Sequence, residues 1–218
     1  MEVSFGRSVK CRDGSFGKLA DVVVDPATMR LTHLITSPPD AEPRLIPLEL
    51  ADTAAGGPDL ALSCTLAATE ELASVREYRD LQSAEETDAA DDDWDLGVEH
   101  VLALPYDTAG GLGLGAYEGV EPSLNVSYDR VPKGSAELRH ASAIVTADGH
   151  YLGGIKGFQL ADGGQIQEVV LEESHFWSRN EITIPVDAVQ TLETDTVVVR
   201  LSADEIAELP TTRVRRWF

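Results

Sequence analysis

The stretch Asp13-Gly14-Ser15-Phe16-Gly17-Lys18-Leu19-Ala20-Asp21-Val22-Val23-Val24-Asp25 joins an Asp-Gly turn signal to a run of β-branched residues. A similar stretch, Asp148-Gly149-His150-Tyr151-Leu152-Gly153-Gly154-Ile155, lies much later in the chain. Each continues into an Ile-Pro step, which is Ile46-Pro47-Leu48 in the first and Ile184-Pro185-Val186 in the second. This repetition predicts a duplicated small β module.

Short apolar segments separated by Gly, Asp and Pro turns surround both stretches. In the first module they predict strands at 8–12, 18–24, 31–36, 44–50 and 60–65. A helix is expected to open at Thr69 and to reach about Tyr78. In the second module the predicted strands are 141–146, 151–160, 166–172, 181–186 and 196–201. A capping-box pattern from Ser202 to Glu205 then opens a short helix that ends at Pro210.

Short strands at a spacing of roughly ten residues are typical of small barrels. We therefore predict a mainly β fold with two small β-barrels, each followed by a short helix and joined by an acidic linker. The predicted domains are a first barrel at 1–79, a linker at 80–134, and a second barrel with a basic-aromatic tail at 135–218. Because a lone core of about 70 residues is marginal, the two barrels should pack on each other or on a second chain.

The acidity of the chain is concentrated in the predicted linker. The 218 residues carry a formal net charge of −21, and residues 80–129 hold 13 acidic residues and no Lys or Arg. Neither module carries the basic stripe that a phosphate backbone requires, which disfavours nucleic acid as a partner. The glycine-rich linker is expected to be flexible except for one patch, which Trp94 and Tyr106 would anchor on a barrel.

Cysteine usage and hydropathy predict a cytoplasmic protein. No segment approaches the ~20 apolar residues of a membrane span, and the N-terminus has no signal-peptide pattern. In a reducing compartment Cys11 and Cys64 are expected as packed thiols, although neighbouring strands would also allow a disulfide.

No motif specifies a reaction, a cofactor or a metal. The glycines of 110–115 lack the strand, the helix and the Lys-Ser/Thr pair of a phosphate loop. The acids of 88–95 lack the alternation and the turn glycine of a calcium loop, and the histidines lack the spacing of a helical zinc site. We therefore predict no catalytic residue, no cofactor and no metal ligand.

Two segments are predicted to contact a partner. The loop after the 166–172 strand carries an aromatic pair that is exposed at a loop tip or, alternatively, closes the barrel end. The C-terminal tail is a basic-aromatic cluster that could reach a phosphate, an acidic partner or the chain's own linker. The candidate residues are His175, Phe176, Trp177, Arg179, Arg213, Arg215, Arg216 and Trp217.

The pattern Asp-Gly-x-x-Gly-Lys-x-x-Asp, followed by an Asp-Pro turn and an Ile-Pro strand, resembles the PRC-barrel domain. Residues 6–50 fit this pattern. Residues 140–201 resemble a second copy of an actinobacterial style, in which Gly153-Gly154 replaces Gly-Lys and Asp162-Gly163 replaces Asp-Pro. The family includes the cytoplasmic domain of the photosynthetic reaction centre H subunit and a barrel of the ribosome maturation factor. The resemblance implies a scaffold or protein-interaction module without family-wide catalytic residues.

The expected function is therefore that of a non-enzymatic scaffold or protein-interaction protein built on tandem PRC barrels. Its expected partner is another protein or a second copy of this chain in a homodimer. One alternative is a ribosome- or RNA-processing-associated factor, which the charge distribution disfavours. Another is a small-molecule binder or enzyme of unknown type, which a deep polar pocket with converging titratable groups would favour.

Overall fold

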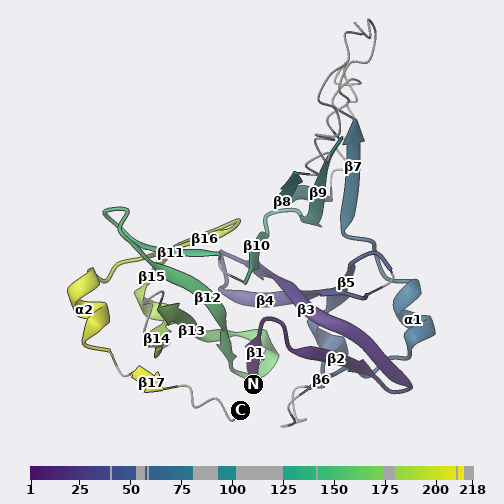
Figure 1. The fold of residues 1–218 in the computed structure, drawn as a ribbon, viewed down its shortest axis with the longest axis horizontal. Coiled ribbons are helices and arrows are strands. Elements are labelled where there is room, and N and C mark those ends of the chain that lie inside the picture. Colours follow the sequence, from purple (N-terminus) through teal and green to yellow (C-terminus); the bar gives the residue numbers. More distant parts are fainter. Residues whose placement is uncertain are drawn as a thin grey trace, which may run out of the picture.

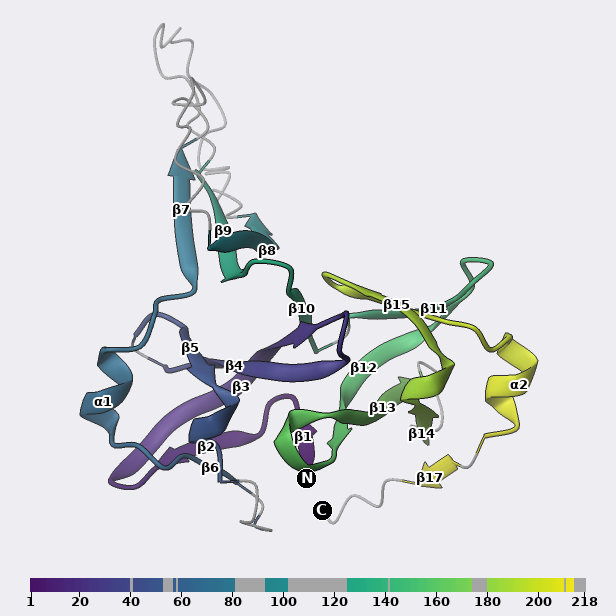
Figure 2. The same cartoon turned by 180° about the vertical axis from the view of Figure 1, so that it is seen from behind.

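A computed structural model describes residues 1–39, 41–52, 57, 59–80, 93–101, 125–140, 142–173, 180–209 and 211–213. The fold is mainly β, with two large sheets side by side and a small sheet that projects from the first (Figure 1). Two short helices lie at opposite ends of this body (Figure 2). Among the described residues, no helix is both long enough and apolar enough to span a bilayer.

The first large sheet contains the first repeated stretch. Its strand order is β5-β4-β3-β2-β6, and β6 runs parallel to β2. Helix α1 (Leu66–Glu70) follows β6, and the side chain of Thr65 accepts a hydrogen bond from Ala68 N as its N-cap. The bounds of the strands and of the short 3-10 helix after β5 are β2 (Ser8–Cys11), β3 (Gly14–Asp25), β4 (Arg30–Ser37), β5 (Arg44–Pro47), η1 (Leu48–Leu50) and β6 (Leu60–Ala61).

The second large sheet repeats these connections in β11 to β14 and β16, and it has β15 and β17 in addition. Its strand order is β15-β16-β11-β12-β13-β14-β17, and β16 runs parallel to β11. Ser202 and Glu205 form the predicted capping box at the start of α2 (Ala203–Ala207). The other elements are β11 (Ala143–Thr146), β12 (Tyr151–Leu160), η3 (Asp162–Gly164), β13 (Ile166–Glu173), β14 (Asn180–Pro185), η4 (Val186–Ala188), β15 (Val189–Glu193), β16 (Thr196–Val199) and β17 (Thr211–Arg213).

The two large sheets correspond residue by residue in their pairing. In the first, Val22 of β3 lies opposite Leu34 of β4, which lies opposite Ile46 of β5. In the second, Phe158, Val169 and Ile184 occupy the same places on β12, β13 and β14. These six side chains are buried, so the repeated pattern marks matching core positions.

Each of the two stretches contains a glycine that lies in close contact with the neighbouring strand. A Cβ atom at Gly17 would lie 2.6 Å from Ser37 O, and one at Gly153 would lie 2.5 Å from Glu172 O. A side chain at either position would collide with the neighbouring strand. Glycine is therefore required where β3 meets β4 and where β12 meets β13.

The strand that precedes each large sheet pairs with the other sheet. Strand β1 (Glu2–Ser4) leads into β2 but pairs with β12, with Val3 opposite Phe158. Strand β10 (Ala136–Arg139) leads into β11 but pairs with β3, with Leu138 opposite Val22. We call this arrangement the strand exchange. It was not predicted from the sequence, because neither segment contains a signal for its partner.

One hydrophobic core runs through both large sheets, so the two sheets pack on each other. Its contributors include Val9 and Leu34 from the first sheet and Ile144 and Val169 from the second. Because both sheets bury apolar side chains in one common interior, each is stabilised by the other, as the small size of each module led us to expect.

The small sheet is formed within and next to the predicted linker. Strands β7 (Arg76–Asp80) and β8 (Trp94–Val101) pair antiparallel with β9 (Asn125–Pro132) in the order β7-β9-β8. The helix expected from Thr69 to Tyr78 is wrong at both ends, because α1 begins earlier, at Leu66, and already ends at Glu70, and Arg76–Asp80 is a strand. Pairing with β9 overrides the local helix preference of this segment.

A second, smaller core lies between the first large sheet and the small sheet. It is composed of Val23, Ile35, Leu45, Val75 and Val131, with Trp94 packed against it. The prediction that Trp94 anchors the linker on the body is thus confirmed, whereas Tyr106 lies outside the described residues. The two-barrel description and the domain bounds stay predictions.

Candidate functional site

A cavity of about 640 Å³ opens where the two large sheets meet. The β3–β4 hairpin and η1 form the wall on the side of the first sheet, and Gly163 and Gly164 of η3 form the other wall. Its lining combines apolar side chains such as Leu48 with the titratable groups of Asp25, Arg30, His33 and Glu49. No sequence signal predicted the cavity, because its walls come from distant parts of the chain.

Backbone and side-chain hydrogen bonds fix the two walls together. The guanidinium of Arg30 donates to Gly163 O, with Nε at 3.1 Å and Nη2 at 2.5 Å. Gln165 Nε2 donates to Thr28 O at 3.1 Å. A Cβ at Gly164 would lie 2.6 Å from Leu31 O, so only glycine permits this approach. Hydrogen bonds therefore join the two walls of the cavity directly.

His33 is a partly buried histidine in the cavity wall. Its Nδ1 lies 3.0 Å from Thr32 Oγ1. Burial lowers the pKa of His33, and the nearby carboxylate of Glu49 opposes this effect only in part. The imidazole is therefore neutral at pH 7, and it can donate or accept one hydrogen bond to a bound molecule.

The carboxylate of Asp25 stabilises the turn between β3 and β4 by accepting hydrogen bonds within it. Its Oδ1 accepts from Ala27 N at 2.9 Å, and its Oδ2 accepts from Thr28 Oγ1 at 2.6 Å. The hydrogen bond from Thr28 is the largest cause that lowers the pKa of Asp25. A carboxylate with a depressed pKa is a weak base, so Asp25 is poorly suited to act as a general base.

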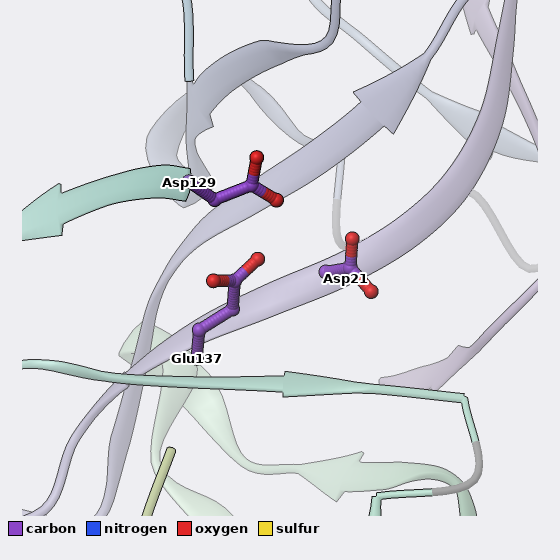
Figure 3. A group of neighbouring side chains, drawn as sticks. All are labelled: Asp21, Asp129 and Glu137. Atoms are coloured by element: carbon purple, nitrogen blue, oxygen red, sulfur yellow. The ribbon is translucent and has the colours of Figure 1, made fainter. Parts of the chain in front are cut away.

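A group of three carboxylates lies between the first large sheet and the small sheet (Figure 3). Asp21 comes from β3, Asp129 from β9 and Glu137 from β10, and one oxygen of each lies within 4.8 Å of the others. Asp129 and Glu137 are buried. Gly97 of β8 leaves room for this group, because a Cβ there would overlap Glu137 Oε2. Carboxylate oxygens are the ligands of hard cations, so this group is a candidate cation site by chemistry alone.

Arg139 supplies positive charge beside the carboxylate group. Its guanidinium donates to Asp195, with Nε at 3.1 Å and Nη2 at 2.7 Å, and Ser142 Oγ donates to the same carboxylate at 2.6 Å. The pKa of Arg139 is raised first by Asp195 and further by Asp21 and Glu137. Burial alone would raise the pKa of Asp195, but the bonds from Arg139 and Ser142 lower it. This network fixes the β15–β16 turn on β10.

The predicted partner-contact residues lie mostly outside the described residues. This applies to His175, Phe176, Trp177, Arg179, Arg215, Arg216 and Trp217. The backbone of Arg213, at the end of β17, pairs with Asn180 of β14. Asn180 directly follows the predicted aromatic loop, and Arg213 directly precedes the rest of the basic tail. The two segments thus adjoin one pair of neighbouring residues, which sequence alone did not indicate.

Other predicted features also fall outside the described part of the chain. The glycines of 110–115 and the acids of 88–92 are among these features. Asp93 and Asp95 are described and exposed, and Asp95 Oδ2 accepts from Gly134 N at 2.7 Å. Trp94 lies between them along the chain, and the guanidinium of Arg130 stacks 5.1 Å from the centre of its ring.

Residues 141–206 match the family model of the PRC-barrel domain. The match begins just before β11 and ends within α2, so it covers the second large sheet apart from β1 and β17. The PRC-barrel resemblance of this region is therefore confirmed, whereas its actinobacterial style and the first copy at 6–50 stay predictions. No curated protein matches the chain.

Proposed function

We propose that this chain is a non-enzymatic scaffold, built from two PRC-type barrels, that binds a protein partner or a second copy of itself. The observation that carries the proposal is the match of residues 141–206 to the PRC-barrel domain, which is a protein-interaction module. The first large sheet supports a tandem arrangement, because its pairing register repeats that of the matched sheet. A cytoplasmic location is part of the proposal.

Most of the repeated positions are structural, which also favours a scaffold. The residues that correspond between the sheets are core side chains such as Leu34 and Val169, or glycines at close contacts such as Gly17 and Gly153. A shared catalytic group would instead require matching titratable side chains. His33 in the first sheet and Glu168 in the second occupy equivalent positions, but an imidazole and a carboxylate have different chemistry.

The test is cross-linked capture of partners by the full-length protein. Two variants alter the predicted contacts: one changes Phe176→Ala and Trp177→Ala, and the other Arg215→Glu and Arg216→Glu. We expect at least one variant to recover about tenfold less of a partner that the wild type captures, because a few aromatic and Arg residues dominate most interfaces. The matched control changes exposed acids on the body, Glu193→Gln and Glu208→Gln.

Two outcomes would contradict the scaffold proposal. One is equal recovery of every protein by the wild type, both variants and the control. The other is salt-sensitive co-sedimentation with ribosomal particles, which would support the ribosome-associated alternative instead.

The cavity favours small-molecule binding as a second candidate function. It is of ligand size, and it combines the apolar side chain of Leu48 with the neutral imidazole of His33. A panel of small polar molecules should contain compounds that raise the thermal unfolding midpoint of the wild type but not of His33→Ala. The exposed His150→Ala variant is the control. Equal shifts in the His33 variant would argue against binding in this cavity.

A further inference from the structure

Cys11 and Cys64 are neighbours in the first large sheet. Cys11 ends β2, and Cys64 follows shortly after β6, which runs parallel to β2. The backbones of the two segments are joined on either side, because Leu62 N donates to Lys10 O at 2.7 Å and Arg12 N donates to Cys64 O at 3.0 Å. Cys64 also lies close enough to the Cys11 thiol to raise its pKa, and both cysteines are free thiols.

We propose that Cys11 and Cys64 are a redox-active pair that closes to an intramolecular disulfide on reaction with a low-molecular-weight disulfide and reopens on reduction. Strands joined by hydrogen bonds lie about 5 Å apart, which is within the Cα separation that a disulfide accepts. The bond therefore forms with little movement of β2 or of the segment that enters α1.

The two sulfurs differ in access, and this sets the order of reaction. Cys11 is buried, whereas Cys64 is partly exposed. Burial, helped by the neighbouring Cys64, raises the pKa of the Cys11 thiol to about 12. The thiolate is the reactive form, so Cys11 is inert towards reagents in solution and Cys64 reacts first.

The reaction consists of two thiol–disulfide exchanges. The Cys64 thiolate attacks one sulfur of the small disulfide, whose S–S bond breaks and releases one small thiolate. Cys11 then gives its proton to solvent and attacks the Cys64 sulfur, and the mixed S–S bond breaks to release the second small thiolate. The protein loses two protons and two electrons in total, equivalent to two hydrogen atoms, and the small disulfide takes them up and is reduced to two thiols.

The pair is specific to the first large sheet. By the shared register, Thr146 on β11 takes the place of Cys11 on β2. Leu201 takes the place of Cys64, because each directly precedes the N-cap of the following helix. Oxidation would therefore clamp β2 to the entry of α1 and leave the second sheet unchanged.

The test treats the full-length wild type, Cys11→Ala and Cys64→Ala with 2-hydroxyethyl disulfide near pH 8 and follows the intact mass. The wild type should lose two hydrogen atoms and both titratable thiols, and dithiothreitol should restore them. Cys11→Ala should stop at one mercaptoethanol adduct, because nothing resolves the mixed disulfide. Cys64→Ala should not react. If Cys11→Ala fails to fold, Cys11→Val replaces it, because valine fills the buried site.

Closure should also raise the thermal unfolding midpoint of the wild type by roughly 5–10 °C, with no change in treated Cys64→Ala. The proposal is overturned if the wild type keeps a stable adduct at Cys64. It is also overturned if the wild type forms disulfides only between chains, or if Cys64→Ala reacts as fast as the wild type.

Discussion

The two large sheets have the same register but different surroundings on their outer faces. Val23 and Ile35 of the first sheet are buried beneath the small sheet. Their counterparts in the second sheet, Gln159 and Val170, remain partly exposed. The exchanged strands differ in the same way, because Glu137 of β10 is buried whereas Glu2 of β1 is exposed. The position of a residue in the repeat thus determines its partner on the adjacent strand. Whether its side chain is buried depends on which other element covers that face of the sheet.

The strand exchange contributes one strand to each large sheet. Disrupting it should therefore have the largest effect on the free energy of unfolding. Val3→Asp and Leu138→Asp would each place an unpaired charge in the shared core. Each should lower the free energy of unfolding by about 3–5 kcal/mol, measured by urea denaturation. The control Glu2→Gln, on the exposed side of β1, should change it by less than about 0.5 kcal/mol.

Unequal losses of stability in the two variants would show that β1 and β10 do not contribute equally. If Val3→Asp cost less than about 1 kcal/mol while Leu138→Asp cost several, then β1 would not complete the second sheet in solution.

The contrast between the outer faces predicts the next largest effect. Ile35→Ala should cost about 3 kcal/mol, because it leaves a cavity under the small sheet. The counterpart Val170→Ala should cost only about 1 kcal/mol, because its side chain is partly exposed. Equal costs in chemical denaturation would mean that another element covers the second sheet, or that the small sheet does not cover the first.

The two close-contact glycines should behave alike. Gly17→Ala and Gly153→Ala would each push a Cβ into a backbone carbonyl, and each should cost about 2 kcal/mol. The control is Gly57→Ala, where a Cβ meets nothing within 4 Å. A variant at either repeat glycine that unfolds at the same temperature as the wild type would refute this close approach.

The smallest expected effect concerns an ion pair and its pH dependence. The folded-state pKa of Asp195 is depressed, so its contribution is present above its ordinary value and is lost as the pH falls through the folded value. Asp195→Asn should cost about 1 kcal/mol near pH 7, a modest figure because the side chain is 36% exposed. This cost should shrink below about pH 4.

The pair Lys10–Asp59, at 2.6 Å beside the first sheet, is the control, because Asp195 accepts hydrogen bonds from both Arg139 and Ser142, whereas the Lys10 side chain is 54% exposed. Asp59→Asn should change the free energy of unfolding by less than about 0.5 kcal/mol. If Asp59→Asn lowered the free energy of unfolding more than Asp195→Asn does, the expected order of the two ion pairs would be wrong.

Local patterns predicted the central strands β2 to β4 and β11 to β14, because alternation, Asp-Gly turns and the Ile-Pro step act over a few residues. The strands expected at 44–50 and 60–65 end early, at Pro47 and Ala61, and β1, β10, β15 and β17 were not predicted. The same reasoning failed between Thr69 and Tyr78, where pairing with β9 outweighs helix preference. It also missed the carboxylate group, because Asp21 and Glu137 meet only through the pairing of β10 with β3. Long-range pairing leaves no trace in a short window of sequence.

The sequence by itself determined the repeated register, the core positions such as Leu34 and Val169, and the glycines at 17 and 153. Those features depend on side-chain size and on backbone geometry within one sheet. Only the tertiary structure decided that β1 and β10 exchange partners, that Cys11 and Cys64 lie on neighbouring segments, and that one outer face is covered. These outcomes depend on burying apolar surface between elements far apart in the chain, where shape and area matter and local motif does not.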